Sequence, residues 1–140
     1  MNRNIETIQS IYQAFGRGDV PHILAQLSPK VEWDVWPDLS AQRAGHPLLL
    51  QRTNPAGVGE FFQVLAATLE FHEFKLHDIF GSGHRVAALS CVDCTYRATG
   101  VRLRDEELHL WTFGDDGRVI GFRHYIDTAK HMRGAGLLAA

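Results

Sequence analysis

The opening segment of the chain carries a helical pattern of hydrophobic positions, followed by a strictly alternating one. Apolar residues recur every three or four positions from Ile5 to Phe15, and this spacing predicts a helix with one buried stripe. Asp19 and Pro21 are typical of the start of a second helix, which is short because Pro29 ends it. Alternation in the next segment, VEWDVW (31–36), predicts a strand. Its two faces carry Val31, Trp33 and Val35 on one side, and Glu32, Asp34 and Trp36 on the other.

A long polar segment separates this strand from a third helical pattern. Pro37 to Thr53 is rich in turn residues and is interrupted by Leu48-Leu49-Leu50. Loops of this length in a compact domain are usually functional or mobile. Asn54-Pro55 then fits an N-cap and a first helical residue. The third helix is predicted from an apolar stripe made of Val58, Phe61, Phe62, Leu65 and Leu69.

After about Glu70 the period of the pattern changes from 3.6 to 2. Four strands are predicted, over Phe71–Phe80, Arg85–Ala98, Val101–Phe113 and Val119–Asp127, with glycine-containing turns between them. The tail from Thr128 is either a short helix or a frayed end. Because the helices come before the run of strands, we expect an α+β fold in one domain, residues 1–140, with a curled antiparallel sheet around the helices.

Composition narrows the class of protein. A chain of 140 residues that is 45% hydrophobic can build one sizeable core. A net charge of −2 indicates no excess of basic residues, so we expect no nucleic-acid partner. Neither an apolar run of about 20 residues nor a hydrophobic signal segment occurs, which predicts a cytoplasmic protein without a membrane partner. Cys91 and Cys94 lie three positions apart on a predicted strand and should face opposite sides as separate reduced thiols.

Two histidines are predicted to face each other on the last two strands. If Asp116-Gly117 form a two-residue turn, His109 pairs with His124, on a face that also carries Trp111 and Phe122; a bulge would shift this register by one. Two imidazoles in an apolar hollow cannot comfortably both be charged, so at least one should be a neutral base able to shuttle protons. The alternative is a structural role through hydrogen bonds in the core.

A metal site is the weaker interpretation of the same histidines. It would need a third ligand such as Glu107 or Asp93, and nothing in the spacing fixes one, so we expect no metal. Asp93, in the centre of a strand, either faces the cavity as an acid or base or pairs with Arg97 or Arg104. Asp34 either orients the chemistry or lies on a solvated face. The predicted cavity lining is Tyr12, Trp33, Trp36, Phe61, Phe62, Glu107, Trp111 and Phe122.

Two stretches resemble the NTF2-like superfamily (the cystatin-like cone fold), and within it the SnoaL-like group. They are IYQAFGRGDVPHILAQLSPKVEWDVWP near the start and ELHLWTFGDDGRVIGFRHYIDTAKH near the end. The resemblance implies helices packed in a strongly curved mixed or antiparallel sheet, an apolar cone-shaped pocket, and a homodimer formed through the sheet. Members include ketosteroid isomerases, polyketide cyclases, limonene epoxide hydrolase, scytalone dehydratase and proteins without known activity.

The motifs of individual members carry over incompletely. His124 occupies the position of an aspartate in the epoxide hydrolases, and Tyr12 and Asp34 each lie about one residue away from the steroid isomerase positions. Both departures argue against these two activities. The acid–base residue of the polyketide cyclases falls near His124.

Three hypotheses follow for the function. The first is a cofactor-independent isomerase, cyclase, lyase, dehydratase or hydrolase acting on an apolar carbonyl-bearing metabolite. In this hypothesis His124 is the acid or base. His109 tunes His124 or relays its proton, and Asp93 or Asp34 orients the reacting groups. The second is a non-catalytic module that binds an apolar small molecule. The third is a protein-interaction module, for which Leu48-Leu49-Leu50 is the one candidate patch.

Overall fold

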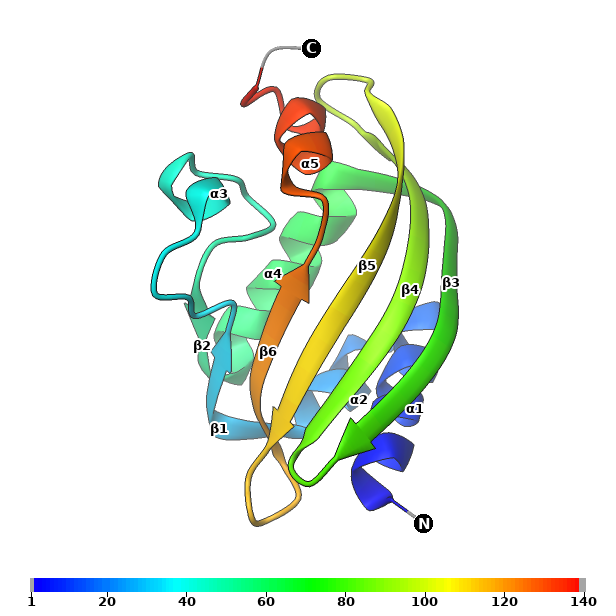
Figure 1. Ribbon diagram of the computed structural model, residues 1–140, viewed down its shortest axis with the longest axis vertical. Coiled ribbons are helices and arrows are strands. Elements are labelled where there is room, and N and C mark those ends of the chain that lie inside the picture. The colour runs from blue at the N-terminus through cyan, green and yellow to red at the C-terminus, as the bar shows by residue number, and fades with distance from the viewer. Residues whose placement is uncertain (1, 139–140) are drawn as a thin grey trace.

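A curved six-stranded sheet with the order β2-β1-β6-β5-β4-β3 frames the molecule (Figure 1). The computed structural model describes residues 2–138, which form five helices and six strands. The helices are α1 (Arg3–Gly16), α2 (Val20–Ala25), α3 (Ser40–Arg43), α4 (Asn54–Thr68) and α5 (Thr128–Gly134). The strands are β1 (Leu27–Trp33), β2 (Arg52–Thr53), β3 (Leu69–Ser82), β4 (Arg85–Tyr96), β5 (Arg102–Phe113) and β6 (Val119–Tyr125).

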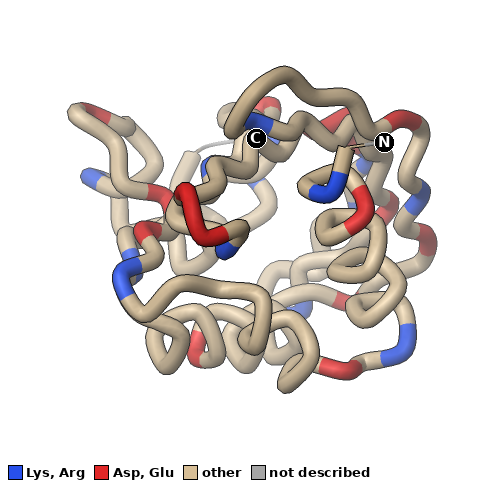
Figure 2. Tube along the Cα trace, turned by 90° about the horizontal axis from the view of Figure 1, so that it is seen from below, with Lys and Arg blue, Asp and Glu red and all other residues tan. Residues whose placement is uncertain are grey.

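The sheet is mixed, because β1 and β6 run parallel while the other neighbours pair antiparallel. The long strands β3, β4 and β5 arch over α1, α2 and α4, which lie on one face of the sheet, and α5 sits at one end (Figure 1). Figure 2, which views the chain from below, shows acidic and basic positions interspersed around the trace. The arrangement of helices and strands confirms the predicted α+β cone. The purely antiparallel sheet expected from the pattern is wrong, because β1 and β6 are parallel; the family resemblance allowed a mixed sheet.

Side-chain caps start the first two helices, and the cap of α2 is the predicted one. The side chain of Asn2 accepts hydrogen bonds from the first backbone N–H groups of α1, and that of Asp19 accepts from His22 at the start of α2. Ile8 and Ile11 on the α1 stripe are buried against the sheet. The N-terminal helices therefore form as the pattern predicts.

The first strand begins and ends earlier than its alternation predicts. β1 already starts at Leu27, and Pro29, expected to end a helix, lies inside the strand, in the stretch where its pairing with β6 is irregular. The strand ends at Trp33 because Asp34 adopts φ 53°, which breaks the alternation of side chains. Asp34 is consequently 0% exposed, so the solvated face considered for it is wrong.

The register of the last hairpin is confirmed at the histidines and wrong at the turn. His109 pairs with His124, and Trp111 pairs with Phe122. The turn itself holds three residues, 115–117, between Gly114 and Arg118, so that Phe113 pairs with Val119 and not with Ile120. An irregularity in the strand pairing next to Thr112 restores the predicted register.

Other expectations hold with small shifts in boundaries. Cys91 and Cys94 are free thiols, the second buried and the first partly exposed, as expected for opposite faces of β4. The tail begins with α5, and the long segment after β1 contains α3 and β2. Within residues 2–138, no helix has both the length and the apolar character that a membrane span requires.

Candidate active site

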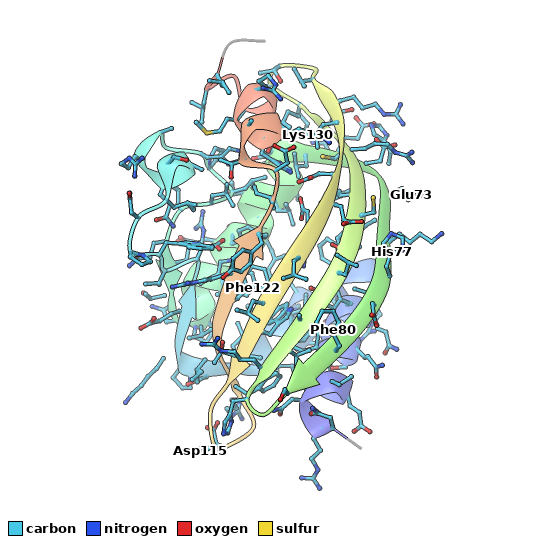
Figure 3. The ribbon with its side chains drawn as sticks, in the orientation of Figure 1. Glu73, His77, Phe80, Asp115, Phe122 and Lys130 are labelled. Carbon is cyan, nitrogen blue, oxygen red and sulfur yellow. The ribbon has the colours of Figure 1, made fainter. Side chains whose placement is uncertain are left out.

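An apolar cavity of about 90 Å³ lies between the concave face of the sheet and the helices. Aromatic side chains supply much of its wall, and they come from elements that are far apart in the sequence. Phe122 marks the β6 side of this wall (Figure 3). Of the predicted lining residues, the structure places Tyr12, Trp33, Phe61, Phe62, Glu107, Trp111 and Phe122 at the cavity.

Trp36 is the predicted lining residue that the structure places elsewhere. Its ring lies 4.4 Å from the guanidinium carbon of Arg123 and edge-on to Tyr125, away from the cavity wall. The reason is the turn at Asp34, after which the alternation of the strand no longer applies. Trp36 still contributes one contact, because its Nε1–H donates to Asp34 Oδ1 at 3.3 Å.

His124 and Asp34 form a buried dyad at the cavity wall. His124 Nδ1 and Asp34 Oδ2 are 2.6 Å apart, and Asp34 Oδ1 accepts the backbone N–H of His124 at 2.9 Å. Since the carboxylate can only accept, Nδ1 carries the proton of this hydrogen bond. Nε2 has no hydrogen-bond partner within residues 2–138, so it is the ring nitrogen that a ligand in the cavity can meet.

The environment of His124 raises its basicity. Burial alone lowers the pKa of this imidazole, but the charge and hydrogen bond of Asp34 outweigh burial and raise the pKa above its usual 6.5. A histidine poised in this way can donate a proton from Nε2 or take one up near neutral pH. The pair therefore has the geometry of an acid–base group.

His109 stands next to this dyad and belongs to a second group of polar side chains. Its ring centroid lies 5.3 Å from that of His124, at an interplanar angle of 83°. Nδ1 of His109 is 2.6 Å from the Tyr12 hydroxyl, and Nε2 is 3.1 Å from Glu107 Oε1. Burial lowers the pKa of His109 more than Glu107 raises it, so the imidazole is neutral at neutral pH.

Glu107 joins His109 to a third histidine, His131, which the sequence interpretation did not include. His131 Nε2 is 3.1 Å from Glu107 Oε2 and 2.9 Å from Asp105 Oδ2. Burial lowers the pKa of His131, but the hydrogen bonds to Asp105 and Glu107 raise it to about 9. Conversely, burial raises the pKa of Glu107, while hydrogen bonds from His109 and His131 bring it well below its usual range.

His46 and Tyr96 complete this network behind His131. The Tyr96 hydroxyl lies 2.8 Å from His131 Nδ1 and 3.0 Å from His46 Nε2. Burial lowers the pKa of His46 to about 4, so this imidazole stays neutral. Asp105 was within reach of the sequence pattern, because positions 105, 107 and 109 share one face of the strand. No sequence pattern indicated His46, because a residue in a loop has no helix or strand periodicity that predicts which way its side chain faces.

The side chains of Asp105, Glu107 and His131 bring their possible ligand atoms within 4.8 Å of one another. A divalent cation prefers such oxygen and nitrogen donors. In this structure, however, one N–H of His131 points to both carboxylates and satisfies them. The cluster is a hydrogen-bonded ion group, and we assign no metal to it.

Asp93 is the candidate that the structure separates from the cavity. It lies on the other face of β4, where Arg102 holds both its oxygens at 3.0 Å and Arg104 approaches at 3.3 Å. The hydrogen bonds from Arg102 lower the pKa of the carboxyl group. Glu73, which points away from β3 at the edge of the sheet in Figure 3, also pairs with Arg104. Ion pairing with Arg104 is thus confirmed, and the cavity placement of Asp93 is wrong because odd positions of β4 face outward.

The segment after β1 closes one side of the cavity. His46, Leu48 and Leu49 all line it, and Gln42 donates to the backbone oxygen of Asp34 at 2.6 Å. Leu48 and Leu49 are buried, so the exposed patch expected at Leu48-Leu49-Leu50 is wrong for these two residues, and of the three only Leu50 is exposed. The segment therefore forms part of the cavity wall.

Comparison with known proteins places the chain in a family. The SnoaL-like domain profile matches residues 8–122. The protein belongs to the SnoaL-like family. An NTF2-like protein of unknown function from Burkholderia pseudomallei is 26% identical, with 96% of this chain and 98% of that chain covered and a TM-score of 0.78.

Two further solved structures share the fold. TerC, co-crystallised with polyporic acid, is 25% identical over 96% of this chain and 99% of that one, with a TM-score of 0.75. A putative isomerase from Bacillus subtilis is 15% identical over 99% and 98% of the two chains, with a TM-score of 0.75, and shows the fold alone. Among curated proteins, no sequence matches this chain.

Proposed function

We propose that this protein is a cofactor-independent acid–base enzyme, an isomerase, cyclase or lyase, that acts on a compact apolar molecule carrying a carbonyl group. His124 is its acid or base, and Asp34 is the positioning residue that holds His124 in one tautomer. The supporting observation is the imidazole with one nitrogen bound to a buried carboxylate and the other unpartnered at an apolar cavity. Enolisation next to a carbonyl needs a base of this kind.

The cavity walls favour an apolar ligand with an oxygen atom. Trp33, a lining residue that is 2% exposed, has an indole N–H without an acceptor within residues 2–138. A buried donor without a partner is costly, and a carbonyl oxygen of the ligand would satisfy it. The volume of about 90 Å³ is smaller than the about 150 Å³ of an engineered cavity that binds benzene, so the cavity favours a compact ligand. TerC, which was co-crystallised with polyporic acid, supports a small organic ligand in this fold.

The direct test measures proton exchange on a probe ketone. Cyclohexanone in heavy water exchanges its α-hydrogens slowly, and nuclear magnetic resonance follows the protein-dependent rate. We expect His124→Gln to lower that rate at least about 100-fold while the fold and cyclohexanone binding persist. His22→Gln, on α2, is a matched control, because the same change outside the cavity should leave the rate as it is. An unchanged rate in His124→Gln contradicts the proposal.

A binding module without catalysis is the second candidate. It is favoured by the hydrogen bonds that already occupy both nitrogens of His109 and the hydroxyl of Tyr12. This alternative predicts that cyclohexanone binds while no variant changes an exchange rate above background. The same titration and exchange experiments therefore separate the two functions.

A homodimer through the outer face of the sheet and a cytoplasmic location are further parts of the proposal. Ile120 and Tyr125 are large, exposed side chains on β6. Sedimentation of the wild-type chain tests the dimer, and Ile120→Asp should shift it to monomer if this face is the contact.

A further inference from the structure

The hydrogen bonds around Glu107 run in one direction. An ionised carboxylate can only accept, so the proton between Glu107 and His109 sits on His109 Nε2. A neutral imidazole that is protonated at Nε2 has a lone pair at Nδ1. The Tyr12 hydroxyl, 2.6 Å from Nδ1, must then donate. Trp111 Nε1–H, which has no acceptor capacity, donates to the same Tyr12 oxygen at 3.2 Å.

This direction fixes what Tyr12 offers to the cavity. Its only hydrogen is committed to His109, so toward a ligand the phenolic oxygen acts as an acceptor. Burial raises the pKa of Tyr12, and the phenol therefore does not keep a negative charge. A proton arriving at Tyr12 has to be passed on to His109, where Glu107 stabilises the resulting cation.

We propose that Glu107 is a positioning residue that sets the His109 tautomer, so that Tyr12 relays a proton from a ligand hydroxyl to His109. The ligand end near Tyr12 is accordingly a hydroxyl or enol, and no bare carbonyl. For an enol, the ligand O–H bond breaks as an O–H bond forms on Tyr12, and the Tyr12 hydrogen moves to His109 Nδ1. The electron pair of the broken O–H bond forms C=O. The electron pair of the enol C=C bond then takes a proton from protonated His124, so that C–H forms as Nε2–H breaks.

His131 makes the effect of Glu107 testable. His131 is a cation at neutral pH, with donors on both ring nitrogens, so in Glu107→Gln the amide oxygen must serve His131. The amide NH₂ group then faces His109 Nε2, which has to lose its hydrogen. His109 is expected to move its proton to Nδ1 and to donate to Tyr12, which reverses the relay.

The experiment reads the tautomer of His109 directly. Nitrogen-15 histidine is incorporated into the full chain, and proton–nitrogen correlation spectra at neutral pH distinguish the two ring nitrogens, with His109→Asn for assignment. We expect Nε2 of His109 to be protonated in the wild type and Nδ1 to be protonated in Glu107→Gln. Protonation of Nδ1 in the wild type overturns the proposal without any variant, and an unchanged tautomer in Glu107→Gln also overturns it.

Glu106→Gln is the matched control, since Glu106 is the neighbouring exposed residue on the outer face of β5. It should leave His109 unchanged, and an inverted tautomer there would contradict a specific role of Glu107. The second arm uses phenol and toluene as probes. Tyr12→Phe should weaken the binding of phenol about 5- to 10-fold and leave the binding of toluene as before; equal effects on the two probes overturn the relay.

The relay rests on the proposed function for the role of His124, but its tests involve no turnover. If His124→Gln leaves the exchange rate unchanged while the His109 tautomer follows Glu107, the proposed reaction fails and the positioning role stands. If the tautomer does not follow Glu107, the relay fails whatever the exchange rate does.

Discussion

Two carboxylate clusters lie on opposite faces of the same sheet and differ in their partners. On the concave face, Asp34 and Glu107 bind imidazoles. On the outer face, Asp93 binds the guanidinium groups of Arg102 and Arg104. Arginine keeps its proton at any pH that a protein survives, whereas histidine exchanges it near neutrality. Burial of a carboxylate in a strand therefore does not identify chemistry; the titration range of its partner does.

The largest expected effect compares the two aspartates by the same substitution. Asp34→Asn removes the charge that raises the pKa of His124, and the ketone exchange rate should fall about 100-fold. Asp93→Asn, outside the cavity, should change this rate less than about 2-fold. Exchange measured on both variants at one pH checks the comparison. Similar losses in both variants would remove the distinction between the two faces.

The second effect concerns stability and pH. The folded-state pKa of His131, about 9, exceeds its unfolded value of 6.5, so its stabilisation is fully present below pH 6.5. It is lost as the pH rises through about 9, and the loss reaches about 3 kcal/mol. Denaturant unfolding measured at the acidic and alkaline ends of this pH window should show a lower free energy of unfolding at the alkaline end in the wild type. In His131→Gln this decrease should be smaller. If the free energy of unfolding decreases equally with pH in the two proteins, His131 is not the source of this pH dependence.

Glu107 acts in the opposite pH direction. Its folded-state pKa is depressed below 4.5, so its stabilisation is present above that pH and is lost as the pH falls through the lower folded value. Glu107→Gln should therefore flatten the acid limb of the stability curve. Glu106→Gln, on the exposed side of the same strand, should leave that limb as in the wild type.

A smaller effect is expected at Trp33. Trp33→Phe keeps an aromatic ring against Phe122 but removes the N–H without an acceptor. Cyclohexanone should bind about 5- to 10-fold more weakly, while cyclohexane, which has no oxygen, should bind as before. Calorimetric titration of both probes measures the difference, and equal losses for both would show that only packing had changed.

The smallest effect belongs to the outer face. Arg102→Gln leaves Arg104 beside Asp93, and both arginines are largely exposed. We expect the melting temperature to fall by about 2 °C or less, and high salt should remove the difference. A larger decrease in melting temperature that persists in high salt would mean that the outer ion pairs stabilise the fold as strongly as the inner cluster does.

The spacing of hydrophobic residues and the pairing register of the strands correctly predicted the regular helices and strands of the molecule. The facing histidines follow from a period of two, and the aromatic wall follows from the helical stripes. The errors at Asp34 and Trp36 follow from one backbone event. Positive φ at Asp34 turned its side chain inward and Trp36 outward, and no pattern of hydrophobic positions reports such a turn.

The remaining site residues depend on contacts between distant segments. His46 reaches Tyr96 from a loop, and His131 reaches Asp105 from the last helix. Sequence spacing fixes neither distance, since both depend on how the loop and the tail fold back over the sheet. Asp93, in contrast, could have been placed correctly from the sequence. The alternation along β4 puts its odd-numbered positions, and therefore Asp93, on the outer face.

Titration of the His124 ring by nitrogen-15 resonance, in the wild type and in Asp34→Asn, tests the central claim most directly. The account predicts a proton that stays on Nδ1, and an Nε2 that titrates above pH 6.5 in the wild type and below it in Asp34→Asn. An Nε2 that titrates below pH 6.5 in the wild type, or that does not respond to Asp34→Asn, would contradict it.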